Sequence, residues 1–183
     1  HWIVALIGAA VAGGLWALIP GLLKAYLNVH EVIATIMMNY VGMYMANYLI
    51  KLTVYDSKKG LSMNVAETAV LPKGGMDYVF FNQLGSTKDM STVNCGIWIA
   101  IGVAIVMYII LNKTTFGYEL KACGYNPNAS RYAGINDKRN IVLSMVIAGM
   151  LAGLGGGLLY LAGANGRHIK VVDVLAAEGF NGI

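Results

Sequence analysis

Three polar side chains recur within one otherwise apolar stretch of the sequence, and their chemistry is hydrogen bonding. Thr35, Asn39 and Asn47 lie between residues 32 and 50, a run without Asp, Glu, Lys or Arg. On a helix, these three residues fall within about a third of the circumference. Polar groups surrounded by hydrocarbon need partners. We therefore expect them either to hydrogen-bond neighbouring helices or to line the path of a polar substrate.

A second candidate stretch, GYNPNASRYAGIN at 124–136, carries the start and stop signals of a short helix. Asn126 is a good N-cap, and Pro127 suits the first helical position because its missing N–H would have no partner there. Gly134 can adopt the left-handed conformation that closes a helix. Since a helix of about two turns is marginal in water, it is expected to pack against its own bundle or against a partner.

One face of this short helix combines small side chains with an aromatic ring: Ala129, Tyr132 and Ala133. That face suits insertion into a groove. The alternative is a turn that lies flat on the membrane surface, with the guanidinium of Arg131 on lipid phosphates. The residues alone leave both possibilities open.

The elements that hold these groups are predicted to be membrane helices. Hydrophobic residues make up 57% of the 183-residue chain and charged residues only 12%, whereas soluble domains carry roughly 25% charged residues. Spans of about the length needed to cross a bilayer are expected at 2–23, 32–50, 95–112 and 140–163. The prediction is an all-α polytopic transmembrane helix bundle, a single domain over 1–183.

Charge placement indicates the orientation of the loops. In the loop 113–139, three of five Lys and Arg residues lie within two positions of a span, where the positive-inside bias acts most strongly. We therefore expect 113–139 on the cytoplasmic side and 51–94 as an external loop. The net charge of +4 lies in loops beside spans, which lipid headgroups explain better than nucleic acid. Apolar sequence at both chain ends suggests that the chain is truncated at each.

Smaller signals concern packing and caps. Gly149, Gly153 and Gly157 repeat at a spacing of four, which predicts close helix packing or a gate that slides. Asn28 and Glu31 form a capping-box pattern for the second span. Cys95 and Cys123, at opposite ends of the third span, are expected to be free thiols, and no metal site is expected.

The segment 114–135, TTFGYELKACGYNPNASRYAGI, resembles the cytoplasmic loop of ABC-importer permeases of the class that serves simple sugars, nucleosides and branched-chain amino acids. The pattern of that class is T-x-F-G-x-E-L-R-A-x-G-x-N-P-x-A-A-R-Y-A-G-I. Lys121 replaces its usual Arg, and Ser130 replaces a common Ala. Residues 19–40 are similar to a pattern of the nucleoside branch, with His30 in place of an Asn. The end of the chain, GFNGI, is similar to the family's G-F-x-G-I.

This resemblance implies that Asn126 to Gly134 forms a coupling helix that fits a groove of a cytoplasmic ATPase subunit. The coupling residues that it implies are Glu119, Ala122, Gly124, Asn126, Pro127, Ala129, Arg131, Tyr132, Ala133 and Gly134. Implied partners are the ATPase subunits, a second permease subunit (the same chain or a paralogue), an external substrate-binding protein and membrane lipids, with no nucleic acid. The implied location is a bacterial plasma membrane, as a multi-pass protein.

The implied function is that of a permease subunit of an ATP-driven importer, with nucleosides as the first substrate class. The alternatives are a simple sugar such as a pentose, or a membrane scaffold that transports nothing. The chain is not expected to be an enzyme: no cofactor belongs to it, and ATP and Mg would bind the ATPase partner, since no G-x-x-x-x-G-K-S/T phosphate loop is present in the sequence. Four residues are candidates for the substrate path: Thr35, Asn39, Asn47 and Asn181.

Overall fold

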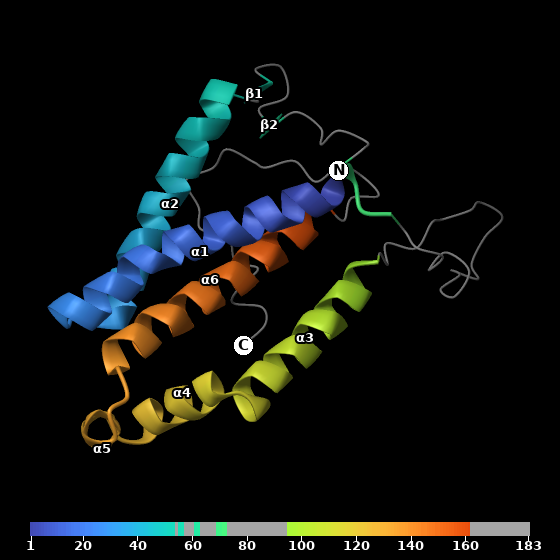
Figure 1. Ribbon diagram of the computed structural model, residues 1–183. Coiled ribbons are helices and arrows are strands. Elements are labelled where there is room, and N and C mark those ends of the chain that lie inside the picture. Colours follow the sequence, from blue (N-terminus) through green and yellow to red (C-terminus); the bar gives the residue numbers. More distant parts are fainter. Residues whose placement is uncertain (54, 57–60, 63–68, 73–94, 162–183) are drawn as a thin grey trace, which may run out of the picture.

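The computed structural model describes residues 1–53, 55–56, 61–62, 69–72 and 95–161. This part of the chain is a set of helices with one two-residue antiparallel ladder, so the all-α prediction is confirmed (Figure 1). The elements are α1 (Trp2–Leu27), α2 (Glu31–Thr53), β1 (Tyr55–Asp56), β2 (Leu61–Ser62), α3 (Gly96–Lys113), α4 (Thr115–Tyr125), α5 (Pro127–Tyr132) and α6 (Asp137–Leu161).

Three of the described helices are long and apolar enough to cross a membrane, namely α1, α3 and α6. They correspond to the predicted spans 2–23, 95–112 and 140–163. Helix α2 has 23 residues, enough in length, but it falls outside this apolar group. Asn39, Asn47 and three tyrosines lower its hydropathy. The predicted crossing at 32–50 therefore stays a prediction. Most of the predicted external loop 51–94 lies outside the described residues.

Helices α1 and α6 lie side by side along most of their length (Figure 1). Small residues at a spacing of four meet across this contact. A Cβ atom built on Gly13 would lie 2.9 Å from the Cα of Gly153, and one built on Gly157 would lie 3.0 Å from the Cβ of Ala9. The predicted close packing of the fourth span is therefore confirmed, and its partner is α1. The two backbones touch because no side chain separates them.

The connection between α1 and α2 differs from the predicted capping box. Asn28 has φ 55° and ψ 27°, so it is the left-handed residue that closes α1 and not the N-cap of α2. Asparagine tolerates this conformation better than most residues. The carboxylate of Glu31 instead lies 3.4 Å from the ammonium group of Lys24. Both side chains are partly exposed, so this ion pair contributes little stability.

Helices α4 and α5 lie at the end of the molecule where α1 ends and α6 begins (Figure 1). At this end, the ammonium group of Lys138 lies 5.2 Å from the centroid of the Tyr26 ring, within the range of a cation–π interaction. Residues 24–31 and the loop 113–139 are thus on one side of the bundle, as alternating crossings require.

Candidate functional site

The loop 113–139 contains two helices, whereas the sequence predicted only the second. Thr114 caps α4: its hydroxyl oxygen accepts a hydrogen bond from the N–H of Gly117 at 3.3 Å, and its O–H donates to the carbonyl oxygen of Ile110. A Cβ atom on Gly117 would lie 2.5 Å from that same carbonyl oxygen. The sharp corner between α3 and α4 therefore requires glycine at position 117.

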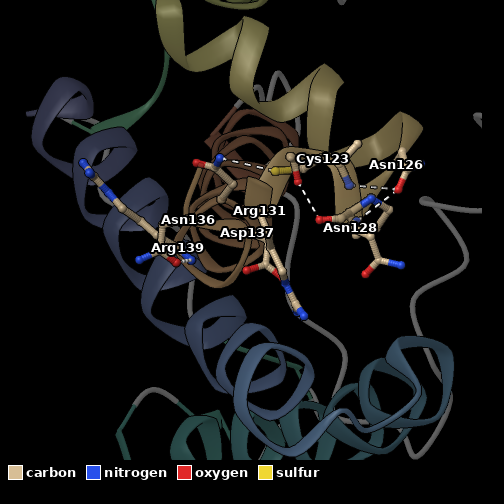
Figure 2. A network of polar contacts seen from close by, with 11 residues as sticks. Cys123, Asn126, Asn128, Arg131, Asn136, Asp137 and Arg139 are labelled. Carbon is tan, nitrogen blue, oxygen red and sulfur yellow. Dashed lines mark hydrogen bonds and ion pairs between the residues drawn. The ribbon is translucent and has the colours of Figure 1, made fainter. Parts of the chain in front are cut away.

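Helix α5 has the caps that the sequence predicted. The side-chain oxygen of Asn126 accepts hydrogen bonds from the N–H groups of Asn128 and Ala129, at 3.0 and 3.2 Å (Figure 2). Pro127 is the first helical residue. Gly134 has φ 79°, its N–H donates to the carbonyl of Arg131, and the N–H of Ile135 donates to that of Ser130, both at 3.0 Å. These two bonds are a Schellman motif, which satisfies carbonyls at the helix end.

Loss of the N-cap is expected to loosen α5 without unfolding the bundle. Asn126→Ala removes the acceptor for two N–H groups and should cost about 1 kcal/mol of local stability, which corresponds to roughly fivefold faster hydrogen exchange of the α5 amides. Asn126→Asp keeps a side-chain acceptor and is the matched control. Hydrogen–deuterium exchange with mass spectrometry measures both variants. Equal exchange in the two would contradict the role of this cap.

An ion pair holds the end of α5 to the start of α6. The guanidinium of Arg131 donates to one carboxylate oxygen of Asp137, from Nη2 at 2.6 Å and from Nε at 3.0 Å, and Figure 2 shows the two side chains pointing toward each other. The hydrogen bond and the charge of Asp137 raise the pKa of Arg131 above its ordinary value. The side chain of Asp137 is 14% exposed and that of Arg131 is 60% exposed. Arg131 is thus bound within its own chain.

A buried amide joins α4 to α6. Asn140 is 1% exposed, and its amide nitrogen donates to the carboxylate of Glu119 at 3.3 Å and to the sulfur of Cys123 at 3.6 Å. Glu119 therefore points toward α6, as well as lining the outer groove described next. Sequence reasoning missed Asn140, because one asparagine in the first turn of an apolar helix gives no sign of its partners.

The outer surface of α4 and α5 forms a groove with a volume of about 540 Å³. Five of the ten predicted coupling residues line it: Glu119, Ala122, Asn126, Ala129 and Ala133. Tyr118 and Tyr125 also line it and are 72% and 91% exposed, and the sequence analysis singled out neither. Tyr132 is 95% exposed outside the lining, where Gly124, Pro127, Arg131 and Gly134 also lie. The arrangement presents aromatic rings around a hollow floored by small side chains.

A second groove, with a volume of about 750 Å³, lies between α1, α2 and α6. Thr35 and Asn39 line it, whereas Asn47 is 9% exposed and lies outside its lining. The hydroxyl of Thr35 lies within hydrogen-bond distance of the carbonyl oxygens of Glu31 and Val32, at 2.9 and 3.1 Å. The fourth predicted path residue, Asn181, is outside the described residues.

Comparison with known proteins identifies the family of this chain. Residues 1–181 match the model of the family described as the permease component of a branched-chain amino acid transport system. The chain is similar to the guanosine ABC transporter permease protein NupP of Bacillus subtilis, with 42% identity over 185 residues, covering 100% of this chain and 49% of the relative. It is also similar to the nucleoside ABC transporter permease protein NupB of Lactococcus lactis, with 44% identity over 154 residues, covering 84% and 41%.

A relative named for another substrate is the galactose/methyl galactoside import permease protein MglC of Haemophilus influenzae. It is 36% identical over 190 residues, which cover 98% of this chain and 51% of the relative. The chain thus spans about half the length of the curated relatives that it matches. No solved structure matches it.

Proposed function

The chain belongs to the family of permease components of branched-chain amino acid transport systems, and from this premise we propose that it is part of the membrane-spanning subunit of an ATP-driven importer of nucleosides. It is a multi-pass protein of the cell membrane, since α1, α3 and α6 are long and apolar enough to span. The substrate class rests on the names of two relatives, which are 42% and 44% identical to this chain.

The capped helix α5, beside the groove of α4, is the main support for the proposed transport mechanism. We assign this surface to a cytoplasmic ATPase subunit, which binds ATP and Mg and supplies the hydrolysis. A helix of six residues keeps its shape only because both of its ends are capped, so it can transmit force as a unit. The exposed tyrosines of the groove are residue types that are enriched at protein interfaces.

The contacts of this surface provide a route by which its movement reaches the membrane helices. The Arg131–Asp137 ion pair ties α5 to α6, and Asn140 ties α4 to α6 through Glu119. Helix α6 in turn contacts the backbone of α1 through its glycines. Displacement of α5 would therefore tilt α6 and α1 together and change the wall of the groove that Thr35 and Asn39 line. The loop 113–139 is cytoplasmic in this proposal, and 51–94 is external.

The proposed importer needs further partners besides the ATPase. A second permease subunit, either the same chain or a paralogue, would supply the other half of the path, and an external substrate-binding protein would deliver the solute. Membrane lipids surround the bundle. The alternative cargo is a simple sugar, which the 36% identity to the galactose/methyl galactoside permease favours.

Uptake measurements on the intact protein test the cargo. Cells that lack the gene should lose uptake of labelled guanosine, and a plasmid copy of the full gene should restore it. Uptake of labelled ribose should stay unchanged in the same cells. Loss of ribose uptake with normal guanosine uptake would replace the nucleoside assignment with the sugar alternative.

A further inference from the structure

The groove between α1, α2 and α6 contains an aromatic side chain that the proposed path residues did not include. Trp16 of α1 is half-buried and lines this groove. Its indole ring lies against the backbone of α2 at Gly42: a Cβ atom built on Gly42 would lie 3.4 Å from Cζ2 and 3.5 Å from Nε1 of the ring. Because Gly42 has no side chain, the indole reaches across the groove to the opposite helix.

A polar side chain lies on the same face of α2. Asn39 is three residues before Gly42, which places the two on one helix face. Both residues line the groove, and among the described residues the amide of Asn39 has no hydrogen-bond partner. An amide has two donor hydrogens and an acceptor oxygen. An amide on an apolar wall, facing open space, is arranged for an occupant that supplies both kinds of hydrogen bond.

The depth of these residues suits a transported solute. Trp16 lies near the middle of α1, and Asn39 lies within the first half of α2. With a rise of about 1.5 Å per residue, Trp16 is about 21 Å from the first residue of its helix and about 17 Å from the last, close to the centre of a hydrocarbon layer about 30 Å thick. Substrate sites of membrane transporters lie near this depth.

We propose that Trp16 and Asn39 form the binding site for the base of a nucleoside during its passage. The base stacks on the indole of Trp16, and the amide of Asn39 binds a donor and an acceptor on the edge of the base. Stacking accepts any base because every base has a π-face, and the amide supplies a donor and an acceptor to the edge of the base. Small residues of α1 and α6, Gly13, Ala17, Gly149 and Gly153, also line the groove.

Thr35 fits the other half of the solute. Since its hydroxyl hydrogen is directed to backbone carbonyls of its own helix, the oxygen is left as an acceptor. It lies one helical turn before Asn39 on the same face. A ribose hydroxyl can donate to it while the base remains on Trp16. This assignment rests on the proposed import function.

Direct binding to the purified intact transporter, without its external binding protein, tests the proposal. The probes are labelled guanosine and uridine, and the variants are Trp16→Ala, Trp16→Phe and Asn39→Ala. Trp16→Ala should raise the Kd for guanosine about tenfold or more and the Kd for uridine by a smaller factor, because a purine has the larger stacking area. Trp16→Phe should retain most of the affinity. Asn39→Ala should raise both values.

A matched control is Trp98→Ala, since Trp98 is a tryptophan on α3 that is 61% exposed and outside this groove; its nucleoside Kd should stay at the wild-type value. The proposal is overturned if Trp16→Ala and Asn39→Ala bind both nucleosides as the wild type does. It is also overturned if Trp16→Ala lowers the yield of folded protein but leaves the Kd for both nucleosides unchanged. In that case another helix covers the groove, and Trp16 packs against that helix. An intact wild type that binds ribose and neither nucleoside would instead contradict the proposed function.

Discussion

Gly153→Ala is expected to destabilise the contact between α1 and α6. The added Cβ atom would lie well inside van der Waals contact with the carbonyl oxygen of Ala9 and 3.2 Å from the Cα of Gly13. These are backbone atoms, which cannot rotate away as a flexible side chain does. Overpacking of this kind costs about 1–3 kcal/mol. Thermal unfolding of the detergent-purified full-length protein, followed by size-exclusion chromatography, should show a lower midpoint.

The same helix supplies the matched controls. Gly155 and Gly156 have no atom within 4 Å of an added Cβ, so Gly155→Ala and Gly156→Ala should leave the midpoint unchanged or raise it slightly, because alanine is the better helix former. If all three variants lowered the midpoint equally, the loss would come from the number of glycines and not from the contact with α1.

The double variant Arg131→Glu with Ala133→Trp is expected to abolish the stimulation of ATP hydrolysis by substrate. The first change puts a second carboxylate beside Asp137, in place of the ion pair that holds α5 to α6. The second change puts an indole into the groove that Ala133 lines. The first change therefore displaces α5 and the second fills the groove, so the ATPase partner can no longer bind this surface correctly. Hydrolysis by the assembled complex, with and without nucleoside, measures the loss.

Exchanging the charges of Arg131 and Asp137 distinguishes two roles of Arg131: holding α5 on α6, or binding the ATPase directly. In Arg131→Asp with Asp137→Arg, the ion pair can form again with its charges reversed, so coupling should return if Arg131 acts by holding α5 on α6. Coupling should remain lost if the guanidinium itself binds the ATPase. Normal stimulation in the original double variant would contradict the proposed coupling surface and favour a membrane scaffold that transports nothing.

The sequence predicted those parts of the loop 113–139 whose structure depends on residues close by in the chain. Asn126, Pro127 and Gly134 act on backbone groups within a few residues of themselves, so their types and spacing were enough to predict α5 and both of its caps. Asn28 shows the limit of the same reasoning. Two local roles competed for it, and the left-handed end of α1 prevailed over the start of α2.

Contacts between two helices could not be predicted from one stretch of sequence. The spacing of Gly149, Gly153 and Gly157 predicted a close neighbour, but only the three-dimensional arrangement identifies α1 as that neighbour. Asn39 and Asn47 fall within the same third of the circumference of α2, and both were candidates for the substrate path. They differ because Asn39 lines the groove beside α1 and α6, whereas Asn47 does not. The same applies to Asn140, whose partners come from α4.

The contact of Gly13 with Gly153 also bears on how the protein is made. Helix α1 emerges from the ribosome before α6, and α2 to α5 are synthesised between them. At about 5–20 residues per second, that interval is on the order of 10 s. During this time the glycine-lined side of α1 lacks the helix that packs against it in the folded chain. Membrane insertion of α1 and its docking on α6 are therefore separate events, and biogenesis factors have time to act between them.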